Sequence, residues 1–223
     1  MSAALALPPY APTPPTARVI PFRLVTEAEY LQRDAALPDG RLEFYDGHVV
    51  AMAGAQPAHN DIVANVLTWL HRQLRGRGCR ARAADQRVQL STKRSYVYPD
   101  VVVGCGELRY NSATNPPSLL NPTLIVEVLS DSTAALDRGR KFQLYQTLPS
   151  LRYYLLLDSQ QVRAELLARE PDADIWTLRT AEGLDVSLEL PALGIALPLA
   201  EIYDAVVFGE GEAPPEAADA PPE

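Results

Sequence analysis

Two acidic residues stand alone inside apolar runs that are typical of strands. In LIVEVL, residues 124–129, Glu127 has three aliphatic residues before it and two after it. In PDVVVG, Asp100 follows a proline and directly precedes three valines. An ionised carboxylate that is buried without a partner costs at least several kcal/mol. Each acid therefore requires a cation, a hydrogen-bond network or a raised pKa.

These carboxylates would form a metal site if their two strands are neighbours. Asp100 and Glu127 would then converge, and their mutual repulsion would require a cation between them. Carboxylate oxygens are hard ligands, which suit Mg²⁺ or Mn²⁺ better than zinc. Glu43, between Leu42 and Phe44, is a third isolated acid that would complete the site.

Lys141 and His59 are the candidate basic groups. Lys141 follows Glu127 by 14 residues, in a predicted helix that packs back on the sheet. On the inward side of that helix, its ammonium would orient a water or offset developing negative charge. His59 begins an earlier amphipathic helix and would contact the site from there, although a capping or core role is the commoner one for such a histidine.

Each of these residues, taken alone, also has a simpler structural explanation. Asp100 would be an exposed turn residue, and Glu127 would form a buried ion pair with an arginine. Lys141 would be a solvated helix residue or the i,i+4 partner of Asp137. The joint occurrence of these residues with Glu43 favours the functional interpretation.

The elements that must position these residues can be predicted from capping signals, turns and periodicity. Residues 26–35 begin with a capping box and predict a short helix. The Asp46-Gly47 pair predicts a hairpin that sets Glu43 opposite Val50. The run AHNDIVANVLTWLHRQL, residues 58–74, has helical periodicity and stops at glycine. Further predictions are strands at 79–90, 97–104 and 123–129, a helix at 133–147 capped by Ser132, and strands at 152–158, 161–169, 175–180 and 186–190.

The order of these elements predicts the fold class. The strand at 123–129, the helix after it and the strand at 152–158 form a βαβ unit, whose strands are parallel with a right-handed crossover. The class is therefore α/β or α+β, with a mixed sheet flanked by helices. One domain is expected at residues 21–208, between a proline-rich leader (1–20) and an acidic tail (209–223) that are not expected to fold.

The distribution of charge points to a polyanionic partner, although the net charge is −8. Between residues 71 and 94, eight basic residues face one acid, Asp85. Such a segment is a candidate phosphate-binding surface. A solvated helix end and a charged strand edge are the alternative. The candidate phosphate-binding residues are Arg72, Arg75, Arg77 and Arg80.

The cysteines and the apolar segments bear on the compartment. Cys79 and Cys105 lack metal-ligand spacing and are predicted to be small core residues rather than a metal site or a disulfide. The leader has no basic n-region, and nowhere do 18 apolar residues follow one another. A cytoplasmic location without a membrane is therefore expected.

Five segments together carry a resemblance to a known family. They are RLEFYDGHVVAMAGAQPAHNDIVANVLTWL, GCRARAADQRVQL, YVYPDVVVG, NPTLIVEVLSDSTAALDRGRKFQLYQTLPSLRYYLLLD and LGIALPLAEIYDAV. In order and spacing, the sequence resembles the Uma-two family of restriction-type endonucleases over about residues 24–207. That family belongs to the PD-(D/E)XK nuclease superfamily. The resemblance implies a restriction-endonuclease-like fold and Mg²⁺-dependent hydrolysis of phosphodiester bonds.

The resemblance also assigns roles along the motif. Its PD is Pro99-Asp100 and its acid is Glu127, but Leu129 stands where the motif has lysine. The resemblance suggests that Lys141, one helix later, takes over the role of that lysine and positions the attacking water.

Further roles follow from the same resemblance. Mg²⁺ would be held by Asp100, Glu127 and the backbone carbonyl of Val128, while Glu43 would bind a second metal or order the lysine. From its place in the predicted strand, between Asp85 and Arg87, Gln86 would also point toward the site. The expected function is a Mg²⁺-dependent endonuclease acting on nucleic acid, DNA in the first place. A homodimer is an open possibility. The alternatives are a catalytically inactive nucleic-acid-binding module with this fold, or a regulatory protein that uses its arginines for a protein partner.

Overall fold

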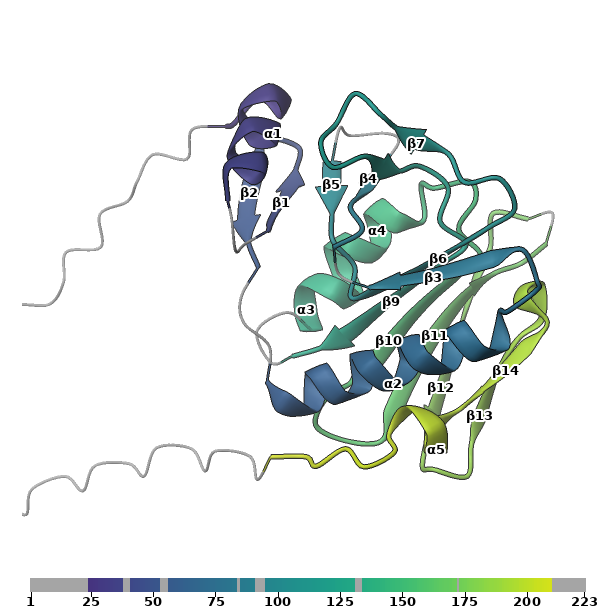
Figure 1. Ribbon diagram of the computed structural model, residues 1–223. Helices are drawn as coiled ribbons and strands as arrows, with labels where there is room; N and C mark the ends of the chain where they lie inside the picture. Colours follow the sequence, from purple (N-terminus) through teal and green to yellow (C-terminus); the bar gives the residue numbers. More distant parts are fainter. Residues whose placement is uncertain are drawn as a thin grey trace, which may run out of the picture.

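The computed structural model describes residues 24–37, 41–52, 56–83, 85–90, 95–130, 134–171 and 173–209. Two six-stranded sheets and one two-stranded sheet form the framework, and helices pack against them (Figure 1). The predicted mixed α+β class, with mixed sheets flanked by helices, is confirmed. The predicted leader at 1–20 and nearly all of the predicted tail lie outside the described residues.

One six-stranded sheet contains the predicted βαβ unit. Its strand order is β12-β11-β10-β9-β6-β3. Within it, β9 and β10 are parallel, as predicted, and all other neighbours are antiparallel. Every residue of β9 is buried, which explains its almost uninterrupted apolar sequence. The strands are β3 (Cys79–Ala83), β6 (Val101–Cys105), β9 (Leu124–Leu129), β10 (Tyr153–Asp158), β11 (Arg163–Arg169) and β12 (Trp176–Glu182).

The other six-stranded sheet contains the predicted hairpin. Its order is β2-β1-β5-β4-β8-β7. The hairpin pairs Tyr45 with His48 and Glu43 with Val50, as the Asp-Gly turn predicts. The strands are β1 (Leu42–Tyr45), β2 (His48–Ala51), β4 (Val88–Leu90), β5 (Ser95–Val97), β7 (Tyr110–Asn111) and β8 (Ser118–Leu119).

Two predicted strands are each divided between the two sheets. The predicted strand at 79–90 becomes β3 in one sheet and β4 in the other, and the predicted strand at 97–104 becomes β5 and β6. Pro99 lies at the second break and has no N–H to donate to a ladder. The chain thus crosses between the sheets directly before Asp100.

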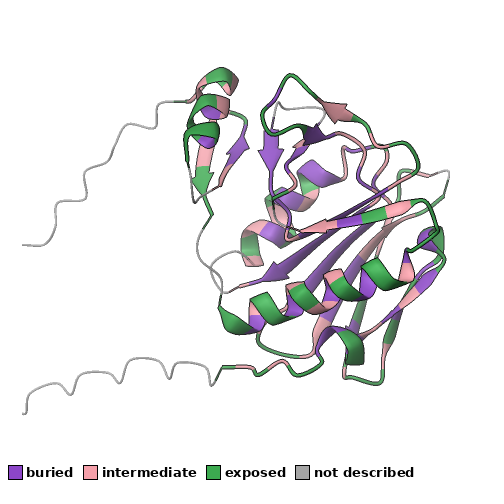
Figure 2. Ribbon diagram, in the orientation of Figure 1, coloured by how far each residue is buried: buried purple, intermediate pink, exposed green. Residues whose placement is uncertain are grey.

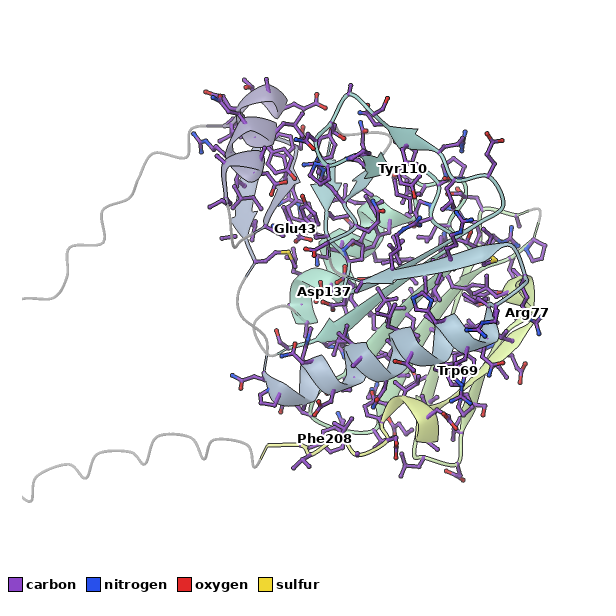
Figure 3. The ribbon with its side chains drawn as sticks, in the orientation of Figure 1. Glu43, Trp69, Arg77, Tyr110, Asp137 and Phe208 are labelled. Atoms are coloured by element: carbon purple, nitrogen blue, oxygen red, sulfur yellow. A yellow bond between two sulfur atoms is a disulfide. The ribbon has the colours of Figure 1, made fainter. Side chains whose placement is uncertain are left out.

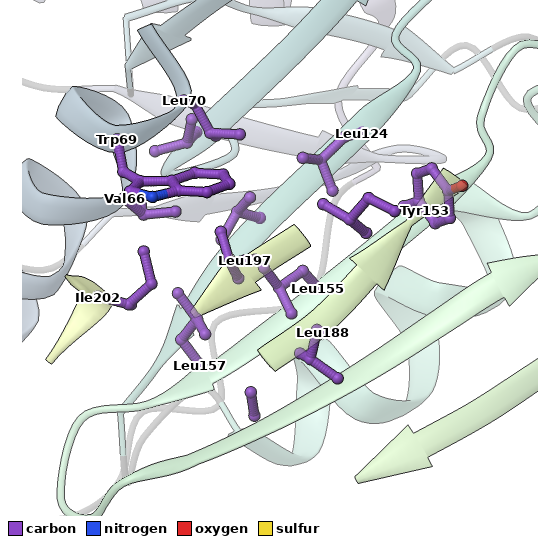
Figure 4. Packing of buried hydrophobic residues seen from close by; sticks show 14 of the residues in the cluster. Val66, Trp69, Leu70, Leu124, Tyr153, Leu155, Leu157, Leu188, Leu197 and Ile202 are labelled. Carbon is purple, nitrogen blue, oxygen red and sulfur yellow. The ribbon is translucent and has the colours of Figure 1, made fainter. Parts of the chain in front are cut away.

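Helix α2 (Pro57–Gln73) covers one face of the β9-containing sheet. Its apolar stripe, including Val66, Trp69 and Leu70, packs against inward residues of the strands such as Leu124 and Leu155 (Figure 4). The chain end completes this layer with β13 (Ser187–Leu190), the 3₁₀ turn η2 (Pro191–Leu193), β14 (Ile195–Pro198) and α5 (Leu199–Ile202). The strands in the centre are buried, whereas the outer face of α2 is exposed (Figure 2).

The opposite face of this sheet is covered by the second sheet and by the helical segment after β9. That segment consists of α3 (Ala134–Leu136), the π-helical turn η1 (Asp137–Lys141) and α4 (Phe142–Tyr145). It corresponds to the predicted helix at 133–147, and its proposed cap, Ser132, lies outside the described residues. Single π-helical turns within helices occur frequently at functional sites.

The prediction for the two cysteines was wrong, because Cys79 and Cys105 form a disulfide. The pairing of β3 with β6 sets the two residues directly opposite each other. Sequence spacing alone does not reveal this register, since the residues are 26 positions apart. Among the helices of the described residues, none combines the length and the apolar character that crossing a bilayer requires.

Helix α1 (Glu27–Ala36) is fixed to the rest of the chain by a buried ion pair. Thr26 and Glu29 form the predicted capping box. At the other end of the helix, Asp34 accepts hydrogen bonds from Arg87 Nη1 at 2.8 Å and from the Tyr98 hydroxyl at 2.5 Å. Arg87 is fully buried, so it belongs to the core rather than to the predicted basic surface.

Removing one partner of this buried pair should destabilise the fold strongly. Asp34→Asn is expected to cost about 3–5 kcal/mol in the free energy of unfolding, since the Arg87 charge would remain buried without its counter-ion. The matched control is Asp85→Asn, which breaks the Arg41–Asp85 pair, whose acid is 84% exposed. This control should cost less than about 1 kcal/mol. Urea unfolding of both variants measures the difference, and equal costs would contradict the structural role of Asp34.

Candidate active site

Glu127 points from the centre of β9 toward the helical segment that follows the strand. Alternation along the strand directs Val126 and Val128 toward α2, and Glu127 to the opposite face. There Glu127 Oε1 accepts hydrogen bonds from Lys141 Nζ at 3.2 Å and from the Tyr145 hydroxyl at 2.7 Å. The cation that partners this acid is therefore a lysine and not an arginine.

Lys141 lies between three carboxylates. Its Nζ is 3.2 Å from Glu127 Oε1, 3.6 Å from Glu43 Oε2 and 3.0 Å from Asp137 Oδ1. All four side chains are almost completely buried. The helix thus carries Lys141 inward, and the i,i+4 contact with Asp137 is present in addition to the contact with the strand acids.

Glu43 reaches this cluster from the other sheet. On β1, Phe44 faces the aromatic cluster of α1, while Glu43 and Tyr45 face the opposite way. Glu43 accepts hydrogen bonds from the backbone N–H of Tyr98 at 3.1 Å and from the Tyr45 hydroxyl at 2.6 Å. Figure 3 shows Glu43 above Asp137.

Asp100 lies directly before β6, beside the end of β9. The pairing of Val101 with Val126 places it next to Glu127 across the two strands. Its Oδ2 accepts a hydrogen bond from the backbone N–H of Val128 at 2.7 Å and lies 3.3 Å from His59 Nε2. The carboxylate takes the place of a ladder carbonyl where the strand pairing ends, and α2 supplies the histidine.

The electrostatics of the cluster show a shortage of positive charge. Burial raises the pKa of Glu127 well above its ordinary value; Lys141 opposes this rise, whereas Asp100 and the other acids add to it. Burial alone would lower the pKa of the Lys141 ammonium, but the carboxylates of Glu127 and Glu43 raise it well above its ordinary value. One ammonium therefore does not neutralise the surrounding acids, and further positive charge would be favourable there.

His59 is likewise biased toward its charged form. Burial acts to lower its pKa, but the hydrogen bond and the negative charge of Asp100 outweigh burial and raise it above the ordinary value. The side chains of His59 and Asp100 are 15% and 13% exposed, more than those of Glu127 and Lys141. This pair is the side of the cluster that solvent reaches.

The two strand carboxylates have donor atoms that fit a divalent cation. Among the described residues, the hydrogen bonds to Asp100 and Glu127 all use one oxygen of each carboxylate, Oδ2 and Oε1. The remaining oxygens, Oδ1 and Oε2, are hard donors of the kind that Mg²⁺ takes. No three His, Cys, Asp or Glu side chains of the described chain are grouped as ligands of one metal. A two-carboxylate site that is completed by waters and substrate phosphates is the usual arrangement for Mg²⁺.

The remaining sequence-predicted residues lie outside this cluster. The side-chain amide of Gln86 donates to the carbonyls of Arg87 and Pro117, and none of its hydrogen bonds within the described residues reaches the carboxylates. The predicted basic residues surround the C-terminal end of α2, where Arg77 donates to the carbonyls of Gln73 and Gly194. Lys93 and Arg94 lie outside the described residues.

Sequence reasoning missed Asp137 and Tyr145 as members of the cluster. Asp137 was predicted only as an i,i+4 partner of Lys141, yet it is buried and its Oδ1 lies 3.0 Å from Lys141 Nζ, within the cluster. Tyr145 was not predicted as a site residue, yet its hydroxyl donates to Glu127 Oε1. The available signal was their spacing of four residues on either side of Lys141, which places all three on one helix face.

Comparison with known proteins identifies the family. Residues 27–200 match the family Uma2, described as "Putative restriction endonuclease". The chain belongs to the Uma2 family. Two uncharacterized proteins of Synechocystis sp. are similar to it. The first, slr1290, is 34% identical over 84% of this chain and 96% of its own length; the second, sll1609, is 33% identical over 78% and 96%.

A solved structure supports the fold of this Uma2 protein. The crystal structure of a putative nuclease belonging to DUF820 from Anabaena variabilis superposes with a TM-score of 0.65. The alignment covers 82% of this chain and 99% of the other, at 13% sequence identity. At that identity the likeness establishes the shared fold.

The charge shortage in the cluster leads to a prediction about stability. Lys141→Met should destabilise the fold by about 3–5 kcal/mol, because three buried carboxylates would lose their ammonium.

Glu127→Gln should instead raise Tm at about pH 7, since it removes an acid whose pKa is raised. A gain of about 1 kcal/mol corresponds to about 2–4 °C for a domain of this size. That gain should fade as the pH falls from the raised pKa of Glu127 toward about 4, where the carboxyl group is protonated in both the folded and the unfolded protein. Calorimetric melting across this pH range tests both variants, and a Glu127→Gln protein that melts below wild type at neutral pH would show that its attraction to Lys141 dominates.

Proposed function

We propose that this protein is a metal-dependent endonuclease that hydrolyses phosphodiester bonds of DNA. The observation that supports it best is the buried Lys141 ammonium, held by Glu43, Glu127 and Asp137 beside the partly exposed Asp100. Membership of Uma2 supports the nuclease chemistry. The metal ion and the DNA substrate are the parts that experiment must establish.

Asp100 and Glu127 are the residues that would hold Mg²⁺ or Mn²⁺, with the carbonyl of Val128 beside them. Their engaged oxygens are fixed by the Val128 N–H, Lys141 and Tyr145, so the other oxygens are held in place. When bound, the metal ion would lower the pKa of a coordinated water and offset negative charge on the scissile phosphate.

Lys141 acts in this proposal as a fixed positive charge. Because its pKa is raised, the amine keeps its proton at neutral pH and does not serve as a general base. It donates hydrogen bonds, and it would orient the attacking water and stabilise charge that develops on the phosphate. Glu43 and Asp137 position the ammonium.

The metal-binding role of the two strand acids can be tested directly. Asp100→Asn and Glu127→Gln should each abolish Mg²⁺ binding and metal-dependent nicking of plasmid DNA, because the proposed site has only two carboxylate ligands. Isothermal titration calorimetry with Mg²⁺ measures binding, and EDTA should stop nicking by the wild type. Asp85→Asn, which removes an exposed acid, is the control. Unchanged Mg²⁺ affinity in both strand variants would place the metal elsewhere.

The role of Lys141 needs a background in which the fold survives its removal. Glu43→Gln lowers the buried negative charge, so Lys141→Met is best made in that variant. The double variant should cleave about 10²-fold more slowly than Glu43→Gln alone, the scale found for preorganised electrostatic groups. Its Mg²⁺ affinity should stay equal or rise, because a competing cation has been removed. Equal cleavage rates in the two proteins would exclude Lys141 from the chemistry.

Metal-dependent DNA binding without cleavage in the wild type would favour the alternative function, a catalytically inactive nucleic-acid-binding module.

A further inference from the structure

A groove with concentrated positive charge lies between α2 and the edge strand β3. Its volume is about 600 Å³, and its lining includes no acidic residue. We call it the arginine groove and define it by His71, Arg72 and Arg75 from α2 and its C-terminal turn, and by Arg80 and Arg82 from β3. Since the whole chain has a net charge of −8, this surface departs from the average charge of the protein.

Three of the four arginines of the groove, Arg72, Arg75 and Arg80, are exposed. None of its four arginines forms an ion pair with a described residue, whereas Arg87, Arg138 and Arg163 each contact a carboxylate. Arg82 stacks its guanidinium over the Tyr110 ring at 5.8 Å, and its Nη1 is buried without a hydrogen-bond partner among the described residues.

The groove and the carboxylate cluster lie toward opposite ends of α2. His59, which contacts Asp100, is in the first turn of the helix, and Arg72 follows it 13 residues later near the other end. At a rise of 1.5 Å per residue, these positions are about 20 Å apart. Figure 3 shows Asp137 near one end of α2 and Arg77 at the other. Strand β3 runs beside the helix, with Ala83 paired to Val101 next to the cluster and Arg80 paired to Gly104 farther away.

We propose that the arginine groove holds the phosphate backbone of one strand of duplex DNA, which continues along α2 to the carboxylate cluster. Phosphates of one strand follow each other every 3.4 Å along the helix axis, so 20 Å corresponds to about six base pairs. The groove therefore anchors the duplex about six base pairs from the cleaved bond. Arg77 takes no part, because its guanidinium caps α2. The cleavage part of this proposal rests on the proposed function, whereas the binding part does not.

Salt dependence of binding tests the groove without any cleavage. The test variant is Arg72→Gln/Arg80→Gln, which removes one exposed arginine from each wall. The control is Arg33→Gln/Arg179→Gln, which removes two exposed arginines outside the groove. Fluorescence anisotropy with a labelled duplex of about 20 base pairs in EDTA gives the slope of log K against log[salt]. The slope is negative, and it should become shallower by about 0.9 for each lost phosphate contact, or by about 1.8 in the test variant. It should stay unchanged in the control. An unchanged slope in the test variant overturns the proposal.

The position of cleavage tests the spacing. On end-labelled duplexes with Mn²⁺, the wild type should cut no closer than about six base pairs to one end, because the groove needs that length of duplex. The test variant should lose this limit. Cuts by the wild type at every distance from both ends would overturn the spacing.

A small diester separates failure of the groove from failure of the proposed function. Bis(p-nitrophenyl) phosphate is too short to reach from the carboxylates to the groove, so the test variant should hydrolyse it at the wild-type rate and Glu127→Gln should not. If wild type hydrolyses the diester but groove substitutions leave duplex binding unchanged, the groove proposal fails and the proposed function stands. If duplex binding depends on the groove while no diester is hydrolysed, the groove stands and the proposed catalysis fails.

Discussion

The arrangement of this protein depends on a single ammonium group that is shared by three buried carboxylates. Lys141 contacts Glu43, Glu127 and Asp137, which arrive from a hairpin, a central strand and a π-helical turn. Buried like charges repel each other strongly, so such a cluster persists only where the surrounding fold holds its members together. Two sheets and one helical segment must therefore dock in a fixed relation.

Much of this arrangement could be predicted from local sequence. The apolar run around Glu127 indicates a buried strand, and a buried acid requires a partner. The Asp46-Gly47 turn fixes the hairpin register that orients Glu43, and the βαβ order returns Lys141 to the sheet. These inferences succeed because turn chemistry, periodicity and chain connectivity are local properties.

The parts that could not be predicted depend on contacts between distant segments. The assignment of β3 and β4 to different sheets, and the pairing that sets Cys79 opposite Cys105, follow from tertiary packing. The sequence likewise contains no signal that Gln86 binds backbone carbonyls or that Arg87 is buried against Asp34. The sequence does not show whether an arginine is buried or exposed. The basic segment at 71–94 therefore contains more arginines than its exposed surface presents.

The hairpin has a thermodynamic consequence that reaches beyond catalysis. Glu43 is attached to β1, and β1 joins the rest of its sheet through β5, with Phe44 opposite Tyr96. Docking of the hairpin brings one more negative charge to a place already short of positive charge. Any cation that enters the cluster, whether a proton or a metal ion, must then favour the docked hairpin, and the docked hairpin must favour the cation by the same free energy. The fraction of molecules in which the β1–β2 hairpin is docked should therefore depend on whether the buried cluster holds a proton or a metal ion.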